Sequence, residues 1–188
     1  MATKRWRLAA LSGVVLLALA AAVTRADQSD ARLDDLFALL QSTADRGAAV
    51  AAEQAIWRIW LNSGREDIDA LMEEGILAMS DRRLDEAISI FTRITERAPG
   101  FAEGWNKRAT AYYLNEDDVS SVEDIRRTLA LEPRHFGAIS GMGLIFLRRG
   151  DDAGALDAFE AVLAIHPHDH GARAQVESLR ERLGERGA

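Results

Sequence analysis

Three evenly spaced prolines constrain the fold of this chain more than any other feature. Pro99, Pro133 and Pro167 are the only prolines in the sequence, and each lies 34 residues after the one before. Each follows a stretch in which apolar residues recur at helical spacing, and proline cannot continue a helix. A period of this length is typical of stacked repeats, in which each unit buries its apolar face against its neighbours.

The segments that these prolines close, residues 68–101, 102–135 and 136–169, match position by position. Positions 8 and 20 of each segment hold small residues, whereas bulky residues dominate positions 4, 11 and 24. Small residues let two antiparallel helices cross closely, and bulky residues fill the space on either side. The small residues are Gly75, Ala109, Gly143, Ala87, Ser121 and Ala155, and the bulky ones are Leu71, Trp105, Ile139, Tyr112, Phe146, Phe91, Ile125 and Phe159.

A polar turn divides each segment in two. The turns begin at Ser80, Asn115 and Arg149 and contain Asp, Asn or Gly, which favour chain reversal and N-capping of the next helix. Each segment is therefore predicted to be a pair of antiparallel helices, and the chain to be all-α.

This pattern closely resembles that of the tetratricopeptide-repeat (TPR) family, with small residues at positions 8 and 20 and proline at position 32. The resemblance covers residues 68–169 and implies a TPR-type α-solenoid of three repeats. Position 7 departs from the family, because it is usually apolar and here holds Glu74 and Arg108 in the first two repeats. Since adjacent repeats bring such positions together, we predict a Glu74–Arg108 ion pair; the alternative is that both point to solvent.

Divergent helical segments flank the repeats. Residues 27–67 contain two apolar helical patterns, the second over about 48–61, and are predicted to form an N-terminal hairpin that is a degenerate repeat or a cap. Residues 170–188 are predicted to form a polar C-terminal capping helix and tail. The apolar residues of the first pattern are Leu33, Leu36, Phe37, Leu39 and Leu40, and the tryptophans expected in the core are Trp57, Trp60 and Trp105.

Residues 1–26 have the composition of a secretory signal. Basic residues within positions 4–7 precede an apolar run over 8–23, and small residues follow as far as Ala26. This order is that of a signal peptide cleaved after Ala26 or Ala22. An uncleaved anchor is the alternative, because the run is just under the length of a membrane-spanning helix. Either interpretation predicts an exported chain, periplasmic or anchored in the inner membrane and facing the periplasm.

Charge and composition exclude several functions. The net charge is −7, and without the four cationic residues of 1–26, which contain no acid, it is −11. Such a domain would be repelled by phosphate backbones, so we expect no nucleic-acid partner. The absence of cysteine excludes disulfides and thiol chemistry. No phosphate-binding loop, nucleophile elbow or zinc-protease motif occurs, so we expect neither catalysis nor a cofactor.

The TPR resemblance implies that a partner binds the concave surface formed by the first helix of each repeat. A methionine- and leucine-lined groove suits an apolar helix or an extended peptide. Met72 and Ile76 replace the polar residues with which some family members clamp a C-terminal carboxylate, so that mode is disfavoured. The alternative for the groove is that the N-terminal hairpin covers part of it. The implied groove residues are Asp69, Met72, Ile76, Met79, Ser80, Glu103, Asn106, Thr110, Tyr113, Leu114, Gly137, Ser140, Leu144, Leu147 and Arg148.

Histidines cluster after the second helices of the later repeats. His166, His168 and His170 alternate within a short loop and could meet on one metal ion if the loop were extended. A loop between two helices seldom holds such side chains together, so a metal site is the least favoured interpretation. The sequence thus predicts a non-catalytic scaffold or adaptor of the bacterial cell envelope that binds a protein or peptide. The alternatives are a membrane-anchored, chaperone-like assembly or maturation factor and a metal-binding protein.

Overall fold

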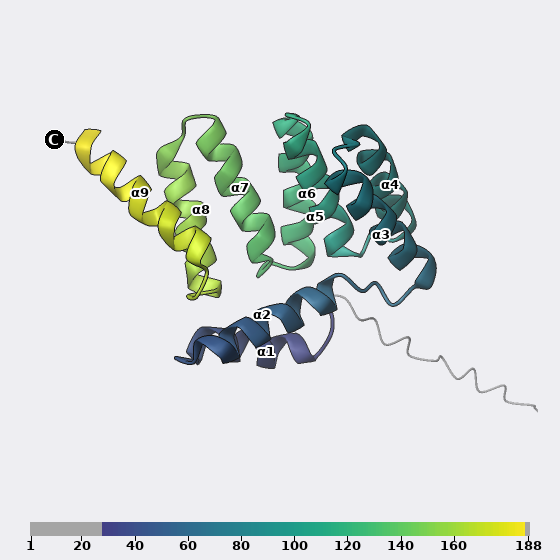
Figure 1. Cartoon of the computed structure of the whole chain (residues 1–188), viewed down its shortest axis with the longest axis horizontal. Helices are drawn as coiled ribbons and strands as arrows, with labels where there is room; N and C mark the ends of the chain where they lie inside the picture. Colours follow the sequence, from purple (N-terminus) through teal and green to yellow (C-terminus); the bar gives the residue numbers. More distant parts are fainter. Residues whose placement is uncertain (1–27, 187–188) are drawn as a thin grey trace, which may run out of the picture.

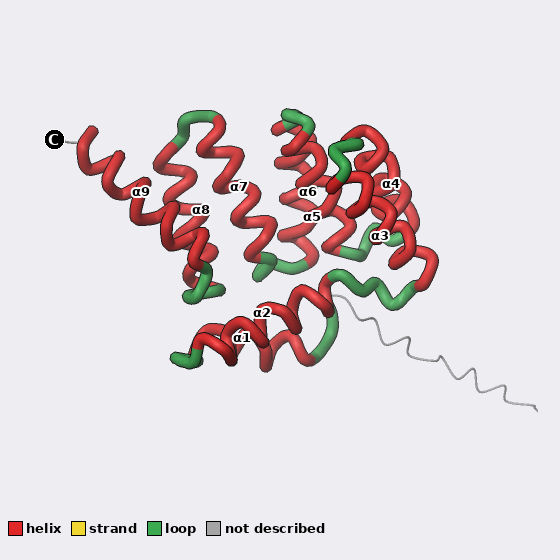
Figure 2. The backbone as a smooth tube through the Cα atoms, viewed as in Figure 1, coloured by secondary structure: helices red, strands yellow, loops and turns green. Residues whose placement is uncertain are grey.

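The computed structural model describes residues 28–186, so the predicted signal or anchor at 1–26 lies outside the described residues. All regular elements within 28–186 are helices, as Figure 2 shows, which confirms the all-α prediction for this part of the chain. None of the described helices is both long enough and apolar enough to cross a membrane. The helices are α1 (Arg32–Ser42), α2 (Arg46–Trp60), α3 (Glu66–Ser80), α4 (Leu84–Arg97), α5 (Ala102–Leu114), α6 (Asp118–Leu131), α7 (Phe136–Arg148), α8 (Asp152–Ile165) and α9 (His170–Arg186).

The three predicted repeats form three helix pairs, α3–α4, α5–α6 and α7–α8. Consecutive pairs pack side by side in a row, and α9 packs on α8 at its end (Figure 1). This is the predicted solenoid. Buried Val176 and Leu179 of α9 belong to the same core cluster as Phe159 of α8, so α9 closes the stack as the predicted capping helix.

The small residues at position 8 allow the two helices of a repeat to cross closely. A Cβ added to Gly75 would lie 2.5 Å from the ring of Phe91, and one added to Gly143 would lie 2.9 Å from that of Phe159. The second repeat replaces this glycine–phenylalanine pair with Ala109 and the smaller Ile125. Space at position 8 therefore varies with the size of the side chain at position 24.

The turns within the repeats place one residue each in the left-handed region. Arg82, Glu116 and Gly150 occupy equivalent positions and have φ values of 61°, 63° and 74°. Only glycine adopts this conformation without steric cost. Asp117 and Asp151 accept hydrogen bonds from the backbone amides of α6 and α8, which confirms the predicted N-caps of the second and third repeats.

The N-terminal hairpin does not occupy the place of a repeat that precedes α3. It lies across the ends of later helices, near the loops before α7 and α9 (Figure 1). Its buried residues share a core cluster with Phe136 and Phe159 of the third repeat. The chain turns away from α3 because Asp69 accepts hydrogen bonds from the backbone and hydroxyl of Ser63, and Gly64 has a φ of 71°.

The predicted Glu74–Arg108 ion pair is wrong. Arg108 instead donates two hydrogen bonds, of 2.7 and 2.8 Å, to Asp124 of its own repeat. It also donates to the hydroxyls of Thr92 and Thr95 on α4, and Glu74 is exposed at the end of the row. Arg108 is partly buried between two repeats. Asp124, on the second helix of the same repeat, is therefore nearer to it than Glu74 on the outer side of α3.

Candidate peptide-binding groove

The concave surface predicted from the repeat pattern is partly filled and partly open. Met72, Glu103 and Asn106 are buried, whereas Leu144 is 38% exposed. Asp69 is held by Ser63 and so contributes to the turn before α3. The remaining predicted residues are half-buried or exposed: Ile76, Met79, Ser80, Thr110, Tyr113, Leu114, Gly137, Ser140, Leu147 and Arg148.

The open part of this surface is a cleft between α5 and α7. It has a volume of about 140 Å³, and six of the predicted groove residues line it. Ala109, Ser121, Ile125 and Gly141 complete its walls. The groove residues among them are Asn106, Thr110, Tyr113, Gly137, Ser140 and Leu144. This cleft is small, so it has room for about one aliphatic side chain of a ligand.

The cations beside the cleft already have partners. Arg148 forms an ion pair with Asp118, donates a 2.9 Å hydrogen bond to the carbonyl of Tyr113 and lies 3.9 Å from the centre of its ring. Lys107 Nζ lies 3.1 Å from Glu103 Oε1. Neither cation is therefore available to a free carboxylate without losing an existing ion pair.

A buried polar cluster lies at the hairpin end of the groove. Glu103 Oε2 is 2.8 Å from His135 Nε2 and accepts a 3.0 Å hydrogen bond from the amide of Asn106. His135 Nδ1 accepts from the backbone N–H of Ala138, so a neutral His135 donates through Nε2 to Glu103. Burial raises the pKa of Glu103, but the charge of Lys107 and the hydrogen bond from His135 outweigh it, and the pKa lies below its ordinary value.

The hairpin packs on this cluster and covers one end of the groove. Trp60 is 1% exposed and stacks on the imidazole of His135 with ring centres 4.1 Å apart. Trp57 covers Gly137, where an added Cβ would lie 2.7 Å from its ring. The hairpin thus reaches the predicted groove at Gly137 and leaves the cleft beside Leu144 open. The core assignment of the tryptophans is confirmed for Trp60, whereas Trp57 and Trp105 are half-buried.

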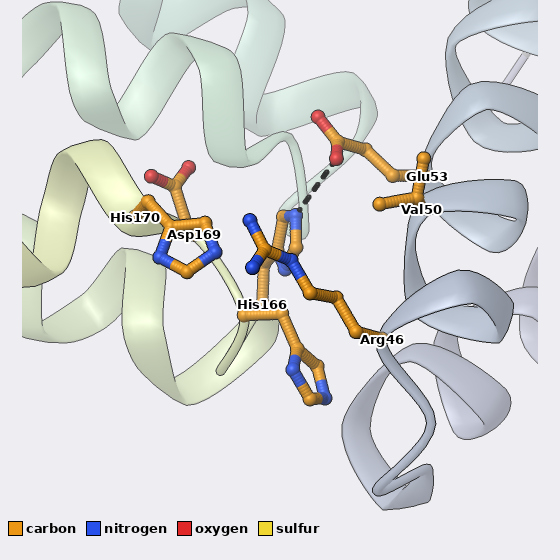
Figure 3. A pocket seen from close by; sticks show the side chains of 7 residues that line it. Arg46, Val50, Glu53, His166, Asp169 and His170 are labelled. Atoms are coloured by element: carbon orange, nitrogen blue, oxygen red, sulfur yellow. Dashed lines mark ion pairs between the residues drawn. The ribbon is translucent and has the colours of Figure 1, made fainter.

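The loop that carries His166, His168 and His170 contacts the hairpin, and its histidine side chains do not converge on one point. His166 Nε2 is 3.3 Å from Glu53, and His168 Nε2 is 2.8 Å from the carbonyl of Thr43. Figure 3 shows the Glu53–His166 ion pair on one side of a pocket, with Asp169 and His170 on the other. Within residues 28–186, no three His, Cys, Asp or Glu side chains are placed to share a metal ion.

Comparison with known proteins agrees with this architecture. Residues 72–127 and 120–170 match the family model described as tetratricopeptide repeat. A TPR repeat-containing protein of Rhizobium etli is 37% identical over 152 residues, which cover 81% of this chain and 74% of that protein.

Two solved structures share the fold. The Sgt2 TPR domain from Aspergillus fumigatus superposes with a TM-score of 0.61 at 23% identity, over 65% of this chain and 83% of that one. The first TPR domain of Spaghetti (RPAP3), bound to an HSP90 peptide, gives a TM-score of 0.59 at 22% identity, over 62% and 93%. Fold and groove together define a helical-repeat protein. More particularly, the chain belongs to the tetratricopeptide repeat family.

Proposed function

We propose that this chain is a non-catalytic adaptor of the bacterial cell envelope that holds a segment of a partner protein in its concave groove. The observation that carries the proposal is the cleft between α5 and α7, which is open, mostly apolar and polar at Tyr113 and Ser140. One aliphatic side chain of the segment enters the cleft, and the polar residues hydrogen-bond its backbone.

The charge of the groove separates this ligand from the one seen in a structural neighbour. The RPAP3 domain was solved with the peptide SRMEEVD, which ends in an acidic sequence. In this chain Lys107 and Arg148 are both engaged in ion pairs beside the cleft. The ligand is therefore a neutral or basic segment with an aliphatic anchor, and its terminal carboxylate is not required.

Site-specific photo-cross-linking in the source cells tests this proposal. A benzophenone side chain at Leu144 of α7 is expected to capture the partner. The same probe at the exposed Val119 of α6, which does not line the cleft, is not expected to capture it. Gly141→Met blocks the cleft from within the chain, because the long side chain fills it. The substitution is tolerated, because a Cβ at this position is in ordinary contact at 3.4 Å from Ile125. Equal adducts from both probes, or adducts that Gly141→Met leaves unchanged, would contradict the proposal.

Export is the second part of the proposal, and the order of basic, apolar and small residues in 1–26 supports it. The apolar run at 8–23 also supports the alternative of a membrane-anchored, chaperone-like assembly factor. N-terminal sequencing of the protein from fractionated cells separates the two. A start near Asp27 in the periplasm is expected for a cleaved signal, and an intact start in the inner membrane for the anchor. Recovery from the cytoplasm would contradict both.

A further inference from the structure

The outer side of α3 carries the packing pattern of the other first helices, but no described helix covers it. In the 34-residue frame, position 10 is Leu77 in α3, Ala111 in α5, Ile145 in α7 and Leu179 in α9. The last three are 0%, 1% and 0% exposed, because each packs on the second helix of the preceding repeat. Leu77 is 58% exposed. It is an apolar residue at a position that is buried wherever a preceding helix is present.

Position 3 shows the same contrast. It is Ala70, Gly104, Ala138 and Ala172 in the four helices, small in every case. Gly104 shows the reason, because an added Cβ would lie 2.7 Å from Ile94 of the preceding helix α4. Ala70 is exposed, whereas its three counterparts are buried. The α3 sequence therefore leaves room for a close helix that the described chain does not supply.

The two ends of the row differ in chemistry. Figure 1 places α3 and α4 at one end and α9 at the other. The free side of α9 presents charged residues such as Glu177 and Glu181, which suit a solvent-facing cap. The free side of α3 presents the apolar Leu77 beside Ala70. A capping role explains the first end but not the second.

Charge indicates what the missing helix would carry. Position 7 is Glu74 in α3 and Arg108 in α5, and Arg108 donates hydrogen bonds to Thr92 and Thr95 of the preceding helix. The sequence of α3 contains five acids and no basic residue. A helix packed on α3 would therefore complement Glu74 with a lysine or arginine at the place that Thr92 and Thr95 occupy on α4.

We infer that the α3 end face, formed by Ala70, Glu74 and Leu77, docks an amphipathic helix of a partner protein that presents aliphatic and basic side chains together. The helix packs as α4 packs on α5, with its aliphatic residues over Ala70 and Leu77 and its cation on Glu74. This surface is separate from the cleft between α5 and α7, so its occupation does not depend on the proposed groove ligand.

A synthetic helix with a sequence adapted from α4 provides the probe. It copies residues 84–98 with Thr92→Arg and Thr95→Lys to face Glu74. Ile90→Gln and Phe91→Gln replace apolar residues on the face of α4 that packs against α3 in the native repeat. A staple between the exposed positions 89 and 93 holds it helical. Fluorescence anisotropy with the full chain is expected to show saturable binding, weakened roughly tenfold by Leu77→Ser and unchanged by Val119→Ser, a matched change at another exposed aliphatic residue.

Charge exchange completes the test. Glu74→Lys is expected to weaken the basic probe roughly tenfold and to restore binding to a probe with Thr92→Glu and Thr95→Glu. Glu74 and Leu77 are both exposed, so circular dichroism of the two variants of the chain should match that of the unchanged chain. Absence of saturable binding, or binding that neither Leu77→Ser nor Glu74→Lys alters, would overturn the inference. Sedimentation showing Leu77-dependent self-association would assign the face to a second copy and overturn the partner class.

Discussion

The repeat stack and the N-terminal hairpin are both built from helix pairs, but different contacts hold them. The stack uses the same pair of positions in every repeat, as Gly75–Phe91 and Gly143–Phe159 show in the first and third. The hairpin is fixed by contacts that each occur once, such as the buried Trp60–His135 stack. A periodic contact is visible in one sequence because it repeats, whereas a unique contact leaves no comparable signal.

The largest expected effect concerns the hairpin. Trp60→Ala removes a fully buried ring that packs on His135 and lies 5.1 Å, centre to centre, from Phe136. The free energy of unfolding is expected to fall by about 3–5 kcal/mol. Urea denaturation followed by circular dichroism measures it. Trp60→Phe is the matched control and should cost much less, because Trp60 Nε1 is buried without a hydrogen-bond partner among the described residues. Equal losses from both changes would contradict this account of the contact.

The contact between positions 8 and 24 of a repeat is expected to contribute less to stability than the Trp60 contact. The residue pair of one repeat is also expected to work in another. Gly75→Ala places a Cβ against the Phe91 ring and should lower stability by about 1–3 kcal/mol. The pair Gly75→Ala with Phe91→Ile reproduces the alanine and isoleucine of the second repeat, and should recover part of that loss. A thermodynamic cycle measures the coupling. Additive losses in the double variant would show that the two positions do not adapt to one another.

Glu103 of the stack lies beside His135, on which the hairpin packs, and its stability contribution depends on pH. Its folded-state pKa is lowered, so its stabilisation is present above the ordinary carboxyl pKa and is lost as the pH falls through the folded value. Glu103→Gln should therefore cost about 1–3 kcal/mol at neutral pH, with the difference from the unchanged chain closing in acid. Denaturation across pH tests this, with the exposed Glu177→Gln as control. A difference that stays constant into acid would contradict the assignment.

The smallest effect is expected at the turns of the stack. Glu116 has a φ of 63°, where glycine is free of strain, so Glu116→Gly should raise stability by about 1 kcal/mol. Gly150→Ala at the equivalent position should lower it by a similar amount. Thermal unfolding of the two variants gives the comparison, and shifts of the same sign would show that the turns are not equivalent.

The periodic part of the fold could be predicted from the sequence, and the rest could not. Spacing of the prolines and of the small residues is enough to place three helix pairs. The position of the hairpin depends on the stacking of Trp60 on His135, which is itself bonded to Glu103, and these residues are far apart in the chain with no shared period. The sequence did contain a sign of the true partner of Arg108. Asp124 lies 16 residues later, at a buried position of the same repeat, but the comparison of equivalent positions drew attention to Glu74 instead.

The groove residues remain a prediction as a binding surface. Six of the residues named from their repeat positions, including Ser140 and Leu144, line the cleft between α5 and α7. Repeat positions could not show that Met72 and Asn106 are buried, because burial there depends on how closely neighbouring helices approach. Nor could they show that Arg148 is held by Asp118 from a different repeat.

Hydrogen exchange tests most directly whether the cleft between α5 and α7 is the binding site. The measurement compares the free chain with the chain bound to the segment recovered by cross-linking at Leu144. Bound segment should slow exchange at the amides of α5 and α7 that border the cleft and leave those of α1 and α2 unchanged. Protection confined to the hairpin, with α5 and α7 unaltered, would contradict the account.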